Sequence, residues 1–211
     1  MRDETRDDDG RLLQLECDPA SDRDAAEAAE AGLVLVREVL QLRRPLPLDG
    51  SDRTTDLVTR PFRRATDAEA VLDINNRAFH WHPDQSGWTL AMLDERLAEP
   101  WVDPDGFLVT EVDGRIAGFC WTKRHDASGT DPAMGEIHVI AVDPDLHGRG
   151  LGRSLTIAGL AHLHRRGLPV GMLHVEGTND SARALYRSLG FVEHDAHRWW
   201  AAPGTPPPSA R

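Results

Sequence analysis

Residues 139–155 read VIAVDPDLHGRGLGRSL, an apolar strand that enters a turn with three glycines and continues into a helix. The first backbone N–H groups of a helix have no partner inside the helix, so they can bind an anion. The glycines let the backbone approach a phosphate closely, and Arg149 and Arg153 add positive charge. The stretch therefore predicts a phosphate site after a buried strand, with a tight turn that binds nothing as the simpler alternative.

Two other phosphate-binding patterns do not fit these glycines. A dinucleotide-binding turn needs an acidic residue at the end of a strand about 20 residues later, and none is present there. A P-loop needs Lys-Ser or Lys-Thr after its last glycine, whereas Arg153-Ser154 follows here.

Composition narrows the class of protein. The 211 residues suffice for one domain of ordinary size and not for two complete ones, and 40% of them are hydrophobic, as in a globular protein. The net charge is -11, which argues against a broad basic surface for nucleic acid. Cys17 and Cys120 have no metal-site or disulfide spacing, and no secretory signal or membrane-length apolar run is present. We expect a cytoplasmic protein without a nucleic-acid or membrane partner.

The chain divides into five segments. Residues 1–24 are polar, acidic and without periodicity, which predicts a disordered lead. Residues 25–48 contain a short helix (25–31) and a strand or bent pair of strands (33–42), and residues 49–56 form a linker. The main domain is expected over 57–200, and residues 201–211, with four prolines, form a tail.

The main domain alternates strands and helices. Asp113-Gly114 is a strong two-residue turn signal and predicts a hairpin. Strands are expected at 57–64, 107–112, 115–123, 136–142 and 170–176, helices at 67–79, 88–98, 151–166 and 179–189, and a final pair of short strands around Phe191 and Trp199. This order predicts an α/β or α+β domain with one central sheet.

The glycine turn resembles the coenzyme loop of the Gcn5-related N-acetyltransferase (GNAT) family, whose pattern is Gln/Arg-x-x-Gly-x-Gly/Ala after a strand. Here His147 stands where the family has Gln or Arg. A second stretch, from Asn179 through Tyr186 to Gly190-Phe191, resembles the family's Asn before a helix that bears a Tyr. The resemblance implies the GNAT acyltransferase fold, a mixed central sheet flanked by helices, with acetyl-CoA as cosubstrate and no metal. It implies coenzyme contacts from Ile140, Ala141, Val142, His147, Gly148, Arg149, Gly150, Leu151, Gly152, Arg153, Asn179, Ser181, Ala182, Arg183 and Ala184.

Within that family, residues 57–195 resemble the catalytic domain of the mycothiol synthases, which have two such domains in tandem. The shared stretches are Asn75–Phe79, His82–Trp88, Trp121–Lys123 and Gly135–Val139. This resemblance implies that residues 25–48 correspond to the end of a first domain. It also implies substrate contacts from Asp84, Lys123, Glu136 and His174, where Asp84 is one methylene shorter than the subgroup's Glu and His174 replaces a Tyr.

Acetyl transfer to an amine requires removal of a proton from the ammonium and protonation of the leaving thiolate. Glu136, at the start of the coenzyme strand, is the candidate general base, and Tyr186, the one tyrosine of the sequence, is the candidate general acid. A backbone N–H of Ile140 or Val142 would polarise the carbonyl. Each residue also has a structural alternative: a strand-end carboxylate for Glu136, a core ring for Tyr186 and a solvated strand-end side chain for Lys123.

We therefore expect an acetyl-CoA-dependent N-acetyltransferase that acts on the cysteinyl amine of desacetyl-mycothiol. One alternative is a GNAT enzyme for another small amine or a protein N-terminus, and another is a non-catalytic CoA-binding remnant. His80 and His82 have no third ligand at a recognisable spacing, which argues against zinc. If a first domain is missing, the exposed surface favours self-association.

Overall fold

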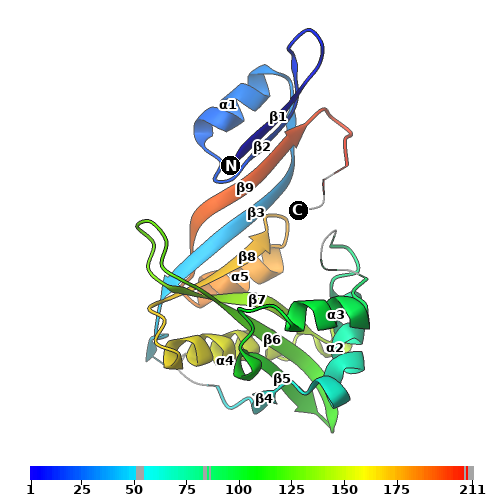
Figure 1. Ribbon diagram of the computed structural model, residues 1–211, viewed down its shortest axis with the longest axis vertical. Coiled ribbons are helices and arrows are strands. Elements are labelled where there is room, and N and C mark those ends of the chain that lie inside the picture. Colours follow the sequence, from blue (N-terminus) through cyan, green and yellow to red (C-terminus); the bar gives the residue numbers. More distant parts are fainter. Residues whose placement is uncertain (51–54, 83–84, 86, 207, 209–211) are drawn as a thin grey trace. The chain divides into compact units, whose positions relative to one another are not determined.

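The computed structural model of the chain describes residues 1–50, 55–82, 85, 87–206 and 208. It contains two compact units, which are described separately (Figure 1). One unit comprises Met1–Arg43 with His174–Arg211, and the other is Arg44–Leu173. No helix in the described part of the chain is long and apolar enough to cross a membrane.

The unit Arg44–Leu173 is built on strands in the order β8-β7-β6-β5-β4. β4, β5, β6 and β7 pair antiparallel, whereas β7 and β8 run parallel, so the sheet is mixed. The elements are β4 (Thr59–Pro61), α2 (Arg64–Ala78), α3 (Leu90–Leu97), η2 (Pro104–Gly106), β5 (Phe107–Val112), β6 (Arg115–His125), β7 (Met134–Val142), η3 (Pro144–Leu146), α4 (Leu151–Arg165) and β8 (Val170–Glu176). The last three residues of β8 belong to the other unit. All helices and strands expected between 57 and 176 are present, and the Asp113-Gly114 hairpin is confirmed.

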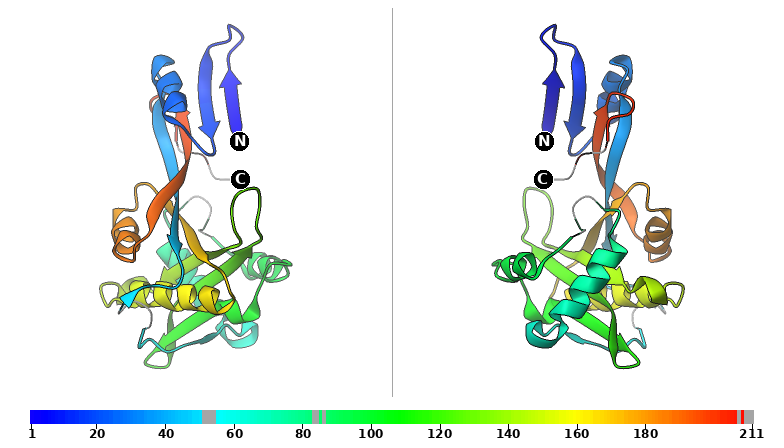
Figure 2. Two further views of the ribbon diagram at one scale, coloured as in Figure 1. Left: turned by 90° about the vertical axis from the view of Figure 1, so that its left-hand side faces the viewer. Right: turned by 90° about the vertical axis from the view of Figure 1, so that its right-hand side faces the viewer.

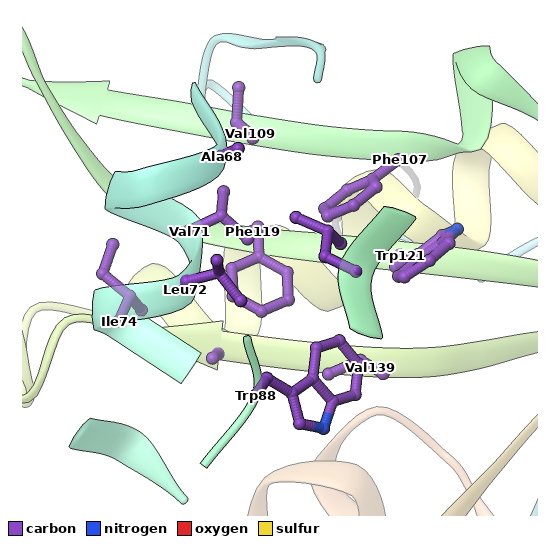
Figure 3. Packing of buried hydrophobic residues seen from close by; sticks show 12 residues of the cluster. Ala68, Val71, Leu72, Ile74, Trp88, Phe107, Val109, Phe119, Trp121 and Val139 are labelled. Atoms are coloured by element: carbon purple, nitrogen blue, oxygen red, sulfur yellow. The ribbon is translucent and has the colours of Figure 1, made fainter. Parts of the chain in front are cut away.

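Helices cover both faces of this sheet (Figure 2). On one face, α2 and α3 bury an apolar cluster that includes Val71, Leu93, Phe119 and Trp121 (Figure 3). On the other face, α4 packs so tightly that a Cβ atom on Gly135 would lie 2.6 Å from Leu163. α4 is the crossover between the parallel strands β7 and β8, and its N-terminus follows the end of β7.

The second unit contains strands in the order β1-β2-β9-β3 and two helices. Its elements are β1 (Arg2–Arg6), β2 (Leu12–Cys17), α1 (Asp22–Glu30), β3 (Val34–Pro45, whose last two residues belong to the other unit), α5 (Asp180–Ser188) and β9 (Val192–Ala201). The expected pair of strands around Phe191 and Trp199 is wrong, because one continuous strand, β9, covers this region and pairs along β3.

The prediction of a disordered lead over residues 1–24 is also wrong. β1 and β2 form a hairpin, and β2 pairs with β9 from the opposite end of the sequence. Leu12, Leu15 and Cys17 are buried and pack with α1 and Trp200. The charged residues of β1 do not resemble a strand, and the strand β9 that pairs with β2 lies about 180 positions away. The interpretation of residues 25–48 as the end of a first domain, the linker at 49–56 and the domain bounds 57–200 stay predictions.

Candidate active site

The glycine turn has the geometry of an anion site. Gly148 and Gly150 have φ values of 79° and 77°, and a Cβ atom on either would meet no atom within 4 Å. Gly150 is the N-cap of α4, whose first turn contains no acidic side chain. The N–H of Ser154 bonds to the carbonyl of Gly150, so the N–H groups before it have no carbonyl one turn back in the helix. The N-terminus of α4 therefore presents several N–H donors and the positive end of the helix dipole beside the uncrowded glycines.

Neighbouring contacts fix the entry to this turn. The carboxylate of Asp143 accepts from the N–H of Asp145 (3.0 Å) and pairs with Arg77 of α2 (2.9 Å). The Arg77 guanidinium lowers the pKa of Asp143, so this pair stays charged. The ring of His147 lies 3.2 Å from the carbonyl oxygen of Val142, where β7 ends. His147 thus ties the start of the turn to the end of the strand.

β7 contains an irregularity that determines which way Glu136 points. Trp121 pairs with Val139 and Thr122 pairs with Ile137, so His138 is an extra residue on β7. After this bulge, Lys123 pairs with Glu136. Trp121 and Lys123 are two residues apart on β6, so their partners share one face of the sheet. Glu136 therefore lies on the same face as the apolar cluster under α2 and α3.

Two histidines contact the Glu136 carboxylate, which is only 8% exposed. His125 Nε2 lies 2.7 Å from Oε2, and His138 Nδ1 lies 3.5 Å from Oε1. The side chain of His125 is 33% exposed. The sequence interpretation assigned no role to His125 or His138. The sequence does hold a signal for His125, because it lies two residues after Lys123 on one strand and so points to the same face of the sheet as Lys123.

Aromatic rings surround Lys123. Its Nζ lies 4.7 Å from the centre of the Trp101 ring, which is a cation–π distance. Trp101 also meets the ring edge of His138 (5.0 Å between ring centres) and Trp121 (5.4 Å). The buried Nε1–H of Trp121 has no hydrogen-bond partner among the described residues. The Lys123 ammonium therefore lies against an aromatic ring on the face of the sheet that carries Glu136, and its role in substrate binding stays a prediction.

α2 binds two residues that follow Asp84 in the sequence, Gln85 and Trp88. Asn75 donates to the carbonyl of Gln85 (2.7 Å), and Asn76 bonds both the N–H (2.8 Å) and the carbonyl (2.9 Å) of Trp88. Asp84 itself lies outside the described residues. The Asn75-Asn76 pair thus fixes the backbone at Gln85 and Trp88.

α5 belongs to the unit formed by Met1–Arg43 and His174–Arg211. Asn179 caps this helix by accepting from the N–H of Ala182 (3.1 Å), as the sequence predicts. Tyr186 is buried, and its ring meets Phe191 edge-on at 5.8 Å between ring centres. Arg183 donates to the carbonyl of Gly177 (2.9 Å). His174 Nε2 lies 3.4 Å from the Gln41 side-chain amide nitrogen.

The predicted site residues therefore fall into two groups. The unit Arg44–Leu173 brings together Lys123, Glu136 and the segment from Ile140 to Arg153. The other unit holds His174 and the residues of α5. The described residues contain no group of three His, Cys, Asp or Glu side chains that could hold a metal ion.

Comparisons with known proteins point to one family. The model of the acetyltransferase (GNAT) family matches residues 68–191. A mycothiol acetyltransferase of Acidimicrobium ferrooxidans is 46% identical over 191 residues, which cover 88% of this chain and 61% of the relative. A mycothiol acetyltransferase of Segniliparus rotundus is 42% identical over 200 residues, with 88% of this chain and 76% of the relative covered. This chain thus spans about three fifths of the length of the first of these curated relatives.

Solved structures agree on the fold. The crystal structure of a GCN5-related N-acetyltransferase from Sphaerobacter thermophilus superposes with a TM-score of 0.69 at 20% identity. The match covers 93% of this chain and 62% of that structure. It confirms the expected mixed sheet flanked by helices.

Proposed function

The chain belongs to the acetyltransferase (GNAT) family, and from this premise we propose that it transfers the acetyl group of acetyl-CoA to the cysteinyl amine of desacetyl-mycothiol. The observation that carries the proposal is the buried Glu136 on the same strand, β7, that leads into the glycine turn. The mycothiol acetyltransferases at 42% and 46% identity support the choice of acceptor.

The residues of the turn fit the pyrophosphate of acetyl-CoA. Backbone N–H groups at the N-terminus of α4 would bind its oxygens, and the side chains of Arg149 and Arg153 would add charge-assisted contacts. In the part of the chain that the structure describes, β7 pairs with β8 over Met134–Ile137 and not beyond. Its backbone beyond Ile137 therefore has donors and acceptors to offer the rest of the coenzyme, including the Ile140 and Val142 N–H groups proposed to polarise the carbonyl.

Glu136 acts as the general base in this proposal. An acceptor amine is protonated near neutral pH and must lose a proton before it can attack. The Glu136 carboxylate is buried and faces the surface formed by Lys123 and Trp101, where an amine would approach. Tyr186 is proposed to give a proton to the departing thiolate, which completes the transfer. This assignment rests on the family signature from Asn179 to Phe191.

Lys123, Glu136, His174 and Asp84 are the proposed acceptor contacts. Lys123 and Trp101 offer what an amino sugar needs, because an ammonium binds hydroxyl groups and an indole face packs on apolar C–H groups of a sugar ring. The cytoplasmic location and self-association also stay predictions.

The test is a direct assay of the purified chain with acetyl-CoA and desacetyl-mycothiol, beside a panel of unrelated amines and peptides. We expect mass spectrometry to show one acetyl group added to the thiol sugar and none to the panel. Products from other amines alone would assign the chain to a different acceptor. Coenzyme binding without any product would identify a non-catalytic protein.

A further inference from the structure

We propose that His125 carries the proton of the acceptor amine from Glu136 to solvent, an inference that rests on the proposed role of Glu136 as base. The Glu136 side chain is 8% exposed, so a proton taken up there needs a route out of the protein. His125 supplies one, since its Nε2 lies 2.7 Å from Glu136 Oε2 and its side chain is 33% exposed. An imidazole that contacts the base through one nitrogen and is partly exposed to water can act as a proton relay.

The proton balance closes within one turnover. The ammonium gives its proton to the Glu136 carboxylate, which leaves a neutral amine and a carboxylic acid. Glu136 passes this proton to Nε2 of His125 in its Nδ1–H tautomer, and the resulting imidazolium releases the Nδ1 proton to water. The ring is then the Nε2–H tautomer, which donates to the regenerated Glu136 carboxylate, and exchange with solvent restores the Nδ1–H tautomer that accepts the next proton.

The surroundings favour His125 over the other nearby groups. His138 lies farther from the carboxylate, at 3.5 Å, and its ring is T-shaped to the Trp101 ring. Lys123, opposite Glu136 in the ladder, has its ammonium over the face of Trp101. Arg124, the neighbour of His125, pairs with Asp126 at 3.2 Å. Among these groups, His125 makes the short contact with the base.

Two substitutions at one position separate a relay from a merely structural contact. His125→Ala removes the ring, whereas His125→Gln keeps a side-chain amide that can hydrogen-bond Glu136 but cannot carry a proton at neutral pH. We expect both variants to lose about tenfold or more in kcat, with KM for acetyl-CoA unchanged. Added imidazole should restore kcat of His125→Ala in a saturable way, because a free imidazole can occupy the vacated position and exchange protons.

Three controls make the result decisive. His164→Gln changes an exposed histidine of α4 on the far face of the sheet and should leave kcat unchanged. Glu136→Gln should lose about 10²-fold or more in kcat and should not respond to imidazole, because its base is gone. Thermal unfolding of each variant shows whether the fold is retained.

Either of two results would overturn the relay. In the first, His125→Gln keeps the wild-type kcat, which would show that His125 only hydrogen-bonds Glu136. In the second, added imidazole fails to restore the kcat of His125→Ala. Failure of the proposed function looks different: in that case Glu136→Gln itself retains turnover, or the wild-type chain does not acetylate the thiol sugar.

Discussion

Glu136 shares a face of the sheet with Val139, although the two residues are three positions apart on one strand. In a regular strand such residues point to opposite faces. The extra residue His138 shifts the alternation by one, so Glu136 and Val139 pair with Lys123 and Trp121, which are two apart on β6. A single bulge thus moves the carboxylate from the face packed by α4 to the face that carries Lys123 and Trp101.

This placement predicts the behaviour of Glu136→Gln. The amide has nearly the shape of the carboxylate but cannot accept the proton of an ammonium. We expect kcat to fall by about 10²-fold or more, the usual contribution of a general base. The dissociation constant of acetyl-CoA, measured by calorimetry, should stay within error of the wild-type value, because Glu136 is distant in sequence from the turn proposed to bind the phosphates. A kcat near that of the wild type would exclude Glu136 as the base.

Tyr186→Phe tests the proposed general acid. The ring contact with Phe191 survives this change, so the helix α5 should keep its packing and the melting temperature should move little. Without the hydroxyl, the thiolate must leave unprotonated or take its proton from water, and we expect kcat to fall about 10²-fold. Tyr186→Ala provides the contrast, because loss of the buried ring should destabilise the fold by about 3 kcal/mol or more. Wild-type turnover in Tyr186→Phe would leave the tyrosine with a packing role alone.

The elements around the glycine turn were predictable from sequence because their signals are local. The turn at Asp113-Gly114, the N-cap at Asn179 and the apolar strand before Asp143 each depend on residues within a few positions. The segment 1–24 was not predictable in this way. β2 pairs with β9, about 180 positions away, and no local pattern in the charged residues of β1 reveals the pairing of β1 with β2.

The candidate site was predictable in part for a related reason. Sequence patterns and family resemblance identify Glu136 and Lys123, but they do not show that His125 touches Glu136. That contact depends on the register between β6 and β7, and the register changes at His138. A bulge has no reliable sequence signal, so the faces of residues beyond it are predicted wrongly whenever the alternation is taken as regular.

Gly150→Ala tests the phosphate site. Gly150 has a φ of 77° and open space around its Cα, so an alanine would suffer backbone strain of about 1–2 kcal/mol without a clash. Relief of that strain would turn the first N–H groups of α4 away from the phosphates, and we expect weaker binding of acetyl-CoA by about tenfold. Gly114→Ala is the matched control, since Gly114 has a φ of 73° and equally open surroundings in the β5–β6 turn. Equal effects of both variants on coenzyme affinity would contradict a phosphate site at Gly150.

The start of α2 depends on a buried carboxylate. Asp67, whose side chain is 3% exposed, accepts from Arg60 of β4 (2.6 Å) and from the N–H of Arg63 (2.7 Å). The hydrogen bond from Arg60 lowers the pKa of Asp67 from 3.8 to about 2. A carboxyl group with a lower pKa in the folded state than in the unfolded state stabilises the fold above its unfolded pKa. This contribution is lost as the pH falls through the folded value.

Asp67 should therefore account for about 2 kcal/mol of the free energy of unfolding near pH 7, which disappears between about pH 4 and pH 2. Asp67→Asn keeps the shape of the side chain but removes the charge that Arg60 binds. We expect this variant to be less stable than the wild type by that amount at pH 7 and to show a flatter decline below pH 4, both measured by urea unfolding. Asp94→Asn, at an exposed ion pair with Arg64, is the control and should lower the stability much less, because solvent screens that pair. Parallel stability curves for the wild type and Asp67→Asn between pH 5 and pH 2 would show that Asp67 does not titrate with folding.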